Sequence, residues 1–168
     1  VYKYLKTNKY VDLLCSITYP NQTDSLEHIS FPNDKDIIKT KSANDFLAHL
    51  KALELDYIFV AGWSELLSSK LINLPRKGTI GFHPSKLPEN RGRHPIIWAL
   101  VLGLEKSAST FFFIGENADD GDILSQEEFP IHYEDDAKSL YKKIEIIALK
   151  QLEGFVSQLN NRMFKRVK

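Results

Sequence analysis

The stretch that decides the fold reads Gly78-Thr-Ile-Gly-Phe-His-Pro-Ser-Lys-Leu-Pro-Glu-Asn-Arg-Gly-Arg-His-Pro-Ile-Ile-Trp98. Its apolar start predicts a strand over Gly78–Phe82, followed directly by His83 and a loop that two prolines make stiff. The apolar run from Pro95 to Leu102 is typical of a buried helix, because proline is favoured in a first helical turn and a glycine closes the run. We therefore expect a strand, a rigid loop and a helix in succession.

The same alternation continues on both sides of this stretch. Further strands are expected at Val11–Thr18, Ile37–Ile38, Asp56–Ala61, Ser107–Ile114 and Ile123–Ile131. Further helices are expected at Tyr2–Asn8, from Ser42 to about Glu54 with a capping arrangement of Ser42 and Asp45, at Leu66–Ile72, and from Asp135 or Asp136 to residue 159. Strands that alternate with helices predict an α/β fold, with a mostly parallel sheet and helices on both faces.

The site is expected at the strand ends. In open α/β sheets, ligands bind at the carboxyl ends of the strands. Gly62-Trp63, His83-Pro84 and the loop after Ile114 each follow a predicted strand. We therefore expect these three segments to meet at one edge of the sheet.

The balance of charges narrows the classes of partner. Lys plus Arg and Asp plus Glu each number 22, so the net charge is zero and offers no general attraction to nucleic acid or anionic lipid. No apolar stretch reaches the roughly 18 residues that span a bilayer, and no signal segment opens the chain. The sequence thus predicts one cytoplasmic domain over residues 1–168, with no membrane or nucleic-acid partner, and leaves homodimer formation open.

Several polar features have both a chemical and a purely structural interpretation. His83 suits proton transfer at working pH, although a lone histidine is more often structural. The loop 117–122 is either a solvated turn or part of a site, and it lacks the full ligand ladder of a calcium loop, so no metal is expected. The basic cluster 90–94 either holds a phosphate or is an exposed loop, and Trp63 either walls a pocket or packs in the core.

Together these residues resemble the folate-dependent formyltransferases. The run from Gly78 to Trp98 is similar to the family's signature loop, Ala118-Asp119-Asp120-Gly121-Asp122-Ile123 is similar to its second signature, and residues 60–67 precede both in the family order. The resemblance implies a Rossmann-like domain that binds N10-formyltetrahydrofolate across the strand ends. Because the family has a strand before the helix at Tyr2, the resemblance also suggests that the first strand and any C-terminal extension are missing here.

The family's catalytic trio of Asn, His and Asp carries over in part. His83 matches the histidine and Asp119 the aspartate, whereas the position expected to carry Asn holds Gly81. In the expected chemistry an amine attacks the formyl carbon, His83 stabilises the oxyanion or moves protons, and Asp119 orients and charges His83. The missing amide is an oxyanion donor, whose loss costs roughly 10² to 10³ in rate, and Asn117 is one candidate to replace it.

The resemblance also implies which residues bind the two substrates. The carrier is expected to lie against Trp63 and to be held largely by backbone groups of Ser64, Glu65, Leu66, Leu67, Ala118, Asp119, Asp120 and Gly121. The acceptor is expected to contact Gly81, Phe82, Pro84, Ser85, Lys86, Arg91, Gly92 and Arg93, with Arg91 or Arg93 on a diphosphate.

The acceptor is the open part of this prediction. The loop after Lys86 most resembles bacterial sugar N-formyltransferases, which modify dTDP-linked 4-amino or 3-amino-6-deoxysugars for surface polysaccharide such as the lipopolysaccharide O-antigen. Glycinamide ribonucleotide and methionyl-tRNA are the enzymatic alternatives, and the neutral charge disfavours the tRNA. An alternative of another class is a folate- or nucleotide-binding domain with impaired catalysis, because Gly81 replaces the expected Asn. A dinucleotide oxidoreductase is disfavoured because no Gly-x-Gly-x-x-Gly follows a strand.

Overall fold

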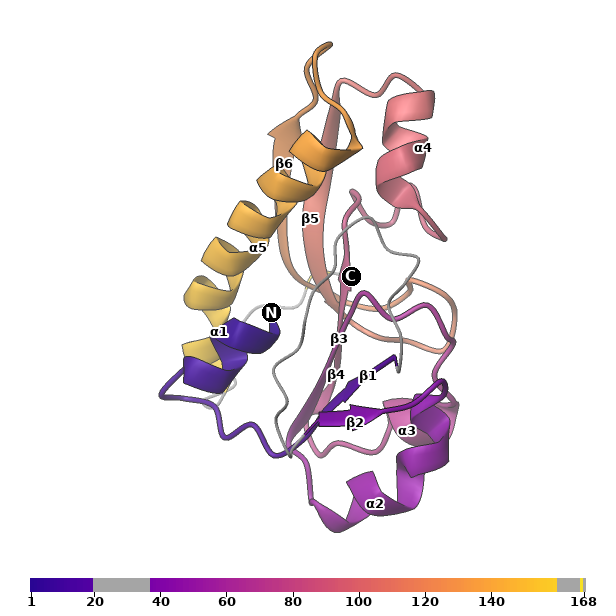
Figure 1. Ribbon diagram of the computed structural model, residues 1–168, viewed down its shortest axis with the longest axis vertical. Coiled ribbons are helices and arrows are strands. Elements are labelled where there is room, and N and C mark those ends of the chain that lie inside the picture. Colours follow the sequence, from indigo (N-terminus) through magenta and orange to yellow (C-terminus); the bar gives the residue numbers. More distant parts are fainter. Residues whose placement is uncertain (20–36, 160–166, 168) are drawn as a thin grey trace.

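Helices and strands alternate along the chain in the computed structural model, which describes residues 1–19, 37–159 and 167 (Figure 1). In chain order the elements are α1 (Tyr2–Thr7), β1 (Ser16–Thr18), β2 (Ile37–Lys39), the 3-10 helix η1 (Ala43–Phe46), α2 (Leu47–Ala52), β3 (Tyr57–Ala61), α3 (Ser69–Ile72), β4 (Gly78–His83), α4 (Pro95–Val101), β5 (Lys106–Phe113), β6 (Ile123–Pro130) and α5 (Ala137–Leu159). The predicted elements are present within a few residues of their expected bounds, except that the strand expected from Val11 begins only at Ser16.

The strands form two sheets. β1 pairs with β2 in parallel, and the second sheet has the order β3-β4-β5-β6. β3 and β4 are parallel, whereas β5 runs antiparallel to both β4 and β6. The segment between β4 and β5 contains only the short helix α4, so β5 begins near the carboxyl end of β4, where Thr110 pairs with His83. The predicted α/β, Rossmann-like fold is confirmed: in the four-stranded sheet β3, β4 and β6 run in one direction, and β5, between β4 and β6, runs against them.

Alternate residues of β3 face opposite sides of the sheet, as the period of two in a strand requires. Tyr57 and Phe59 pack into a core that includes Leu5 of α1 and the buried apolar residues of α5 from Ala148 to Leu159. Ile58 packs on the other side, in a cluster with Leu71 of α3. Figure 1 shows α1 beside α5 and well away from α2 and α3. The helices therefore cover both faces, as expected.

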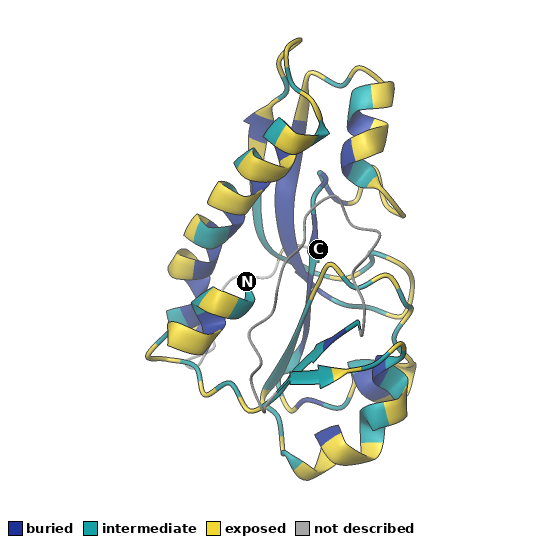
Figure 2. Cartoon of the chain, in the orientation of Figure 1, coloured by how far each residue is buried: buried dark blue, intermediate teal, exposed yellow. Residues whose placement is uncertain are grey.

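The long helix α5 supplies much of the main core. Buried and exposed residues alternate around it at helical spacing, as Figure 2 shows. Buried Gln151 has its polar groups satisfied, because it accepts from Ser109 Oγ at 2.7 Å and donates to Ser125 Oγ at 2.9 Å. None of the described helices combines the length and the apolar character that a bilayer span requires. The buried apolar residues of α5 are Leu140, Ile144, Ala148, Leu152, Phe155, Val156 and Leu159.

α4 is not the fully buried helix that its apolar sequence predicts. Ile96 and Ala99 are buried, but Ile97, Trp98 and Val101 are 41%, 54% and 68% exposed. Ile96 packs in a cluster with buried residues of α5 and with the end of β6. A short helix packed on one side buries only one stripe, and an apolar run on all sides leaves the rest uncovered.

Two aspartates hold the start of α5. Asp136 Oδ1 accepts a hydrogen bond from the backbone N–H of Ser139 at 2.7 Å, which is N-cap geometry. Asp135 accepts from Lys143 Nζ, and also from the backbone N–H of His132 and from Ser139 Oγ, each at 2.7 Å. The Lys143 ammonium, followed by these two donors, holds the pKa of Asp135 far below its ordinary value.

Replacing Asp135 with asparagine is expected to destabilise the protein near neutral pH and progressively less in acid. A carboxyl whose pKa is lowered on folding adds stability above its unfolded pKa of about 3.9, and this contribution is lost as the pH falls through the folded pKa. Tm measured from about pH 7 to about pH 3 should show a gap between wild type and Asp135→Asn that is constant above about pH 5 and narrows below about pH 4. A gap that stays the same at every pH would show that the charge of Asp135 is not its source.

Candidate active site

Two strand ends and one returning loop form the candidate site. The parallel strands β3 and β4 end before Gly62 and at His83. β5 runs the other way, so its last residue, Phe113, pairs with Ile80 in the middle of β4. β5 is therefore an exception within the mostly parallel sheet that the sequence predicts. The loop after β5 nevertheless turns back and places Asp119 against His83.

The two predicted catalytic side chains are in contact. His83 Nδ1 lies 3.5 Å from Asp119 Oδ1, and the side chains are 8% and 23% exposed. The other ring nitrogen, Nε2, lies 3.1 Å from the backbone carbonyl oxygen of Asn90. Carbonyl and carboxylate oxygens only accept hydrogen bonds, so a doubly protonated imidazolium satisfies both contacts and a neutral ring satisfies one. His83 is therefore placed between two acceptor oxygens, one on each of two loops.

The backbone holds Asp119 in this position. Its φ of 48° lies in the left-handed region, which aspartate tolerates better than most residues. Its second oxygen, Oδ2, accepts a hydrogen bond from the backbone N–H of Gly92 at 2.7 Å. One carboxylate thus joins the His83 ring to the loop that follows β4.

The carbonyl group of Asn90 is a contact that the sequence did not predict. It accepts from Ser85 Oγ at 3.0 Å in addition to facing His83. Asn90 has a φ of 54°, and asparagine is among the residues that adopt left-handed backbone most readily. The only signal in the sequence is therefore for a turn at Asn90, not for a partner of the histidine.

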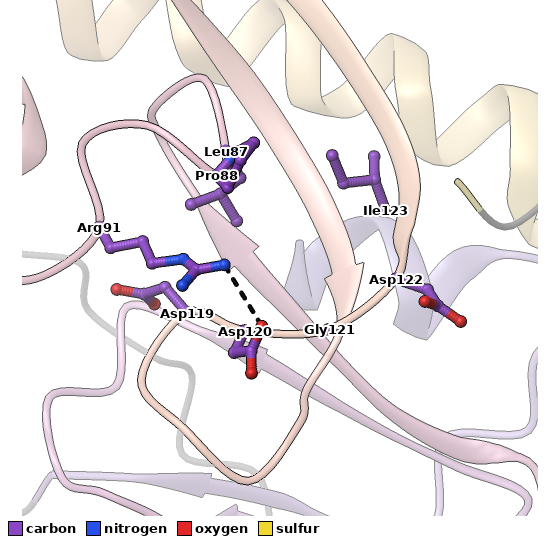
Figure 3. A pocket seen from close by; sticks show the side chains of 8 residues that line it. All are labelled: Leu87, Pro88, Arg91, Asp119, Asp120, Gly121, Asp122 and Ile123. Carbon is purple, nitrogen blue, oxygen red and sulfur yellow. Dashed lines mark hydrogen bonds and ion pairs between the residues drawn. The ribbon is translucent and has the colours of Figure 1, made fainter. Parts of the chain in front are cut away.

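A pocket of about 380 Å³ opens beside Asp119 (Figure 3). The Arg91 guanidinium donates to Asp120 Oδ1 at 3.3 Å and so connects the two loops that flank the pocket. Ligand pockets begin at about 300 Å³, so this space fits a ring system or a sugar. In the described part of the chain, no group of three or more His, Cys, Asp or Glu side chains is arranged to hold a metal ion. The lining residues are Leu87, Pro88, Arg91, Asp119, Asp120, Gly121, Asp122 and Ile123.

The other segment expected to bind the carrier is the loop after β3. Trp63 in this loop stacks on Tyr19, with ring centroids 4.1 Å apart. Ser42 is the N-cap residue of η1, as predicted, but its hydroxyl donates to Glu65 Oε1 at 2.6 Å and does not cap the helix. Leu66 is 77% exposed. The loop contributes no residue to the pocket in Figure 3.

Three residues expected to bind the acceptor turn away from the pocket. Phe82 packs on Phe111, with ring centroids 4.9 Å apart, in the core that faces α5. Ser85 is 1% exposed and donates to backbone carbonyls of its own loop. Lys86 Nζ pairs with Glu128 Oε1 at 2.9 Å, across on β6. These three side chains support the shape of the site instead of lining its pocket.

The remaining acceptor residues lie on the loop surface. Arg91 lines the pocket, Gly92 holds Asp119, and Arg93 is exposed. Pro84, which follows His83 in the sequence, is half-buried. Asn117, the candidate to replace the missing amide, donates from Nδ2 to Asp120 Oδ2 at 3.1 Å and so braces the acidic loop.

The space beside Gly81 is already filled. Gly81 lies two residues before His83 on β4 and pairs with Phe112 of β5. A Cβ atom at Gly81 would lie 2.8 Å from Cε1 and Cζ of Phe112 and 3.0 Å from Cγ1 of Ile114. Phe112 is only 3% exposed, so its ring cannot swing into solvent without exposing core. A buried ring therefore occupies the place where the resemblance leads us to expect an asparagine amide.

Introducing that asparagine is expected to harm the protein. Gly81→Asn should lower the free energy of unfolding by about 1–3 kcal/mol, the usual cost of overpacking a core, and should not raise activity. Urea denaturation of Gly81→Asn and of Gly81→Asn/Phe112→Val measures this, because the smaller valine makes room and should recover part of the loss. A single variant as stable as wild type would contradict the described packing.

Comparison with known proteins identifies the family. The sequence model described as Formyl transferase matches residues 23–153. The methionyl-tRNA formyltransferase of Thermodesulfovibrio yellowstonii is 35% identical over 104 residues, which are 62% of this chain and 34% of that protein. A sugar N-formyltransferase from Shewanella sp. matches with a TM-score of 0.66 and 25% identity, covering 79% of this chain and 52% of that chain. A phosphoribosylglycinamide formyltransferase from Bacillus halodurans matches with a TM-score of 0.64 at 23% identity, covering 76% of this chain and 69% of that chain, and this likeness shows the fold alone.

The matches cover most of this chain but only part of its relatives. The chain spans about a third of the length of the Thermodesulfovibrio protein, 34%. The matched range 23–153 runs across β4, the His83 loop and the acidic loop with Asp119. This range is most of the chain and includes both predicted catalytic residues. The chain therefore belongs to the formyl transferase family.

Proposed function

We propose that the protein transfers a formyl group from N10-formyltetrahydrofolate to an amine of a nucleotide-linked aminodeoxysugar. The observation that carries the proposal is the contact of His83 with Asp119 beside an open pocket, in a chain of the formyl transferase family. A histidine next to a carboxylate is suited to proton transfer.

The pocket fits part of such a carrier. Pro88 and Ile123 offer apolar surface to the face of a ring, and the carboxylates of Asp119 and Asp120 accept hydrogen bonds from ring N–H and amino groups. The volume of about 380 Å³ holds a ring system, so the rest of the carrier would extend over the surface. When bound, the carrier supplies the formyl group on a nitrogen that becomes a leaving group.

His83 is proposed to move the protons of this transfer. As the new carbon–nitrogen bond forms, the neutral His83 ring takes a proton from the acceptor amine, and the resulting imidazolium gives that proton to the carrier nitrogen as the old carbon–nitrogen bond breaks. Asp119 Oδ1 stabilises the positive charge on the ring from 3.5 Å. The same two groups therefore serve both halves of the exchange.

The proposed mechanism requires the loop around Asn90 to shift. Nε2 of His83 faces the Asn90 carbonyl, and Nδ1 faces Asp119, so neither nitrogen is free for a substrate. The Asn90 carbonyl keeps a hydrogen bond from Ser85 Oγ when it releases Nε2, so the shift does not leave it without a partner. Nε2 is then the atom that exchanges protons with the substrate.

Two other functions each have an observation in their favour. The sequence relative from Thermodesulfovibrio yellowstonii is a methionyl-tRNA formyltransferase, but a net charge of zero gives this chain no general attraction to tRNA. The ring of Phe112 beside Gly81 favours a binding domain with impaired transfer, because it replaces an expected oxyanion donor. Tight binding of the carrier with no turnover of any acceptor would support this second alternative.

The basic loop is expected to hold the diphosphate of the acceptor. Arg91 lines the pocket and Arg93 is exposed beside it, and guanidinium groups bind phosphate through paired hydrogen bonds. Arg91→Ala/Arg93→Ala should raise the KM for the nucleotide-linked sugar by about tenfold or more, as expected for the loss of charged hydrogen bonds. Steady-state kinetics with Arg76→Ala as the control tests this, since Arg76 pairs with Glu54 and Asp56 away from the site. An unchanged acceptor KM in the double variant would refute the assignment.

A further inference from the structure

The carboxylate of Glu65 is already fully used within the protein. It accepts four hydrogen bonds, from Ser42 Oγ at 2.6 Å, the Ala43 backbone N–H at 3.1 Å, Asn44 Nδ2 at 3.2 Å and Trp63 Nε1 at 3.3 Å. These bonds, that of Ser42 first, lower the pKa of Glu65, so the group stays ionised. Glu65 therefore has little capacity left to bind a ligand.

Asn44 forms hydrogen bonds with the backbone of the same loop. Its Nδ2 also donates to the Leu66 carbonyl at 3.3 Å, and its Oδ1 accepts from the backbone N–H of Ser68 at 2.8 Å. We call Glu65 and Asn44, with these bonds, the Glu65–Asn44 clamp. The clamp joins η1 to the loop after β3 on both sides of Leu66.

The start of the loop is held as well. Trp63 stacks on Tyr19 at an interplanar angle of 6°, and the backbone N–H of Ser64 donates to the Tyr19 hydroxyl at 3.3 Å. This loop nevertheless lies at the surface of the protein, because Leu66 is 77% exposed. Trp63 and Leu67 of this loop pack against the cluster of Ala43, Leu50 and Leu71, whereas Leu66 between them is held without being buried. Such fixing does lower the entropy cost of binding a ligand against the loop.

We infer that Glu65 and Asn44 are positioning residues, which hold the backbone of residues 63–67 and the exposed Leu66 side chain ready to receive the folate carrier. The inference rests on the proposed function, because it takes the carrier as the ligand of this loop. The sequence led us to expect that Glu65 itself contacts the carrier. The inference instead gives Glu65 an indirect role, through the loop that it holds. Neither residue contacts His83 or Asp119, so the clamp should affect carrier binding and not the chemical step.

The experiment is a titration with tetrahydrofolate, the carrier without its formyl group, followed by calorimetry. Glu65→Gln keeps the shape but turns one oxygen into an N–H donor that faces other donors. The Kd should rise about tenfold, as expected for lost hydrogen bonds to a charged group, while kcat at saturating carrier stays near wild type. Glu54→Gln is the matched control, since the Glu54 side chain is 81% exposed and forms an ion pair with Arg76, and the Kd of this variant should not change.

A second pair of variants separates positioning from general damage. Asn44→Asp alone should also weaken binding, because the new carboxylate faces both Glu65 and the Leu66 carbonyl. Combined with Glu65→Gln it should recover part of the affinity, because the new glutamine amide can donate to the new aspartate. If Glu65→Gln does not fold, Ser42→Ala takes its place, since it removes only the 2.6 Å bond and should raise Kd several-fold.

The outcomes test this inference separately from the proposed function on which it rests. Failure of the wild-type chain to bind tetrahydrofolate would reject the proposed function, and the inference with it. Binding by wild type with the same Kd in Glu65→Gln, or in Ser42→Ala, would overturn the clamp alone. A fall in kcat with unchanged Kd would also overturn it, because it would place Glu65 in the chemical step.

Discussion

His83→Ala is expected to lower kcat/KM for formyl transfer by about 10² to 10⁴, the range of a lost acid–base catalyst. The fold should survive, because the Asn90 carbonyl that faces the ring keeps its hydrogen bond from Ser85 Oγ. His49→Ala is the matched control, since His49 is exposed on α2, far from the site in the chain. Initial rates of tetrahydrofolate release, with circular dichroism to confirm folding, measure the effect.

Asp119→Asn separates the charge of Asp119 from its shape. The asparagine oxygen can still accept from the Gly92 backbone, but it no longer stabilises a positive His83 ring. The rate should fall by about 10 to 10³ with little change in Tm. Full turnover in either His83→Ala or Asp119→Asn would remove these residues from the mechanism.

Gly121→Ala is expected to be the most damaging addition of a single methyl group in the site. Gly121 has a φ of 131°, and an added Cβ would lie 1.8 Å from the backbone oxygen of Phe113 and 3.0 Å from the nitrogen of Gly115. Neither atom can move cheaply, because Phe113 ends β5, which is paired on both sides. The loss of stability should exceed about 3 kcal/mol, and activity should fall because the reshaped loop carries Asp119 away from His83.

Gly103→Ala is the control for this prediction. Gly103 also has a positive φ, 61°, but nothing lies within 4 Å of an added Cβ. It should cost only the backbone penalty of about 1–2 kcal/mol. Urea denaturation of both variants measures the difference, and equal losses would show that the contact with Phe113 does not restrict position 121.

Local patterns in the sequence predicted the helices and strands well. They predicted the pairings between distant residues less well. The apolar spacing of α5 located it to within two residues, because one long amphipathic stripe has a single way to pack. The direction of β5 was not predicted, because it depends on the path of the connection from β4 and not on the sequence of β5. Ser42 and Asp45 look like a cap, but a stronger partner, Glu65, competes for the serine hydroxyl.

The candidate site divides in the same way. The contact of His83 with Asp119 was expected from two motifs, and the structure brings the side chains together. The role of the Asn90 carbonyl could not be predicted, since every residue carries one and only the turn geometry directs it at the ring. The ring of Phe112 against Gly81 depends on the register of β4 with β5, which no local pattern encodes.

The most direct test of the proposed function is formyl transfer from N10-formyltetrahydrofolate to a panel of amines, followed by product mass and by release of tetrahydrofolate. The panel holds dTDP-linked 4-amino- and 3-amino-6-deoxyglucose, UDP-linked 4-amino-arabinose and glycinamide ribonucleotide. We expect turnover of a nucleotide-linked aminosugar and its loss in His83→Ala. Binding of the carrier with no turnover of any amine would contradict it and would identify a folate-binding domain that no longer transfers.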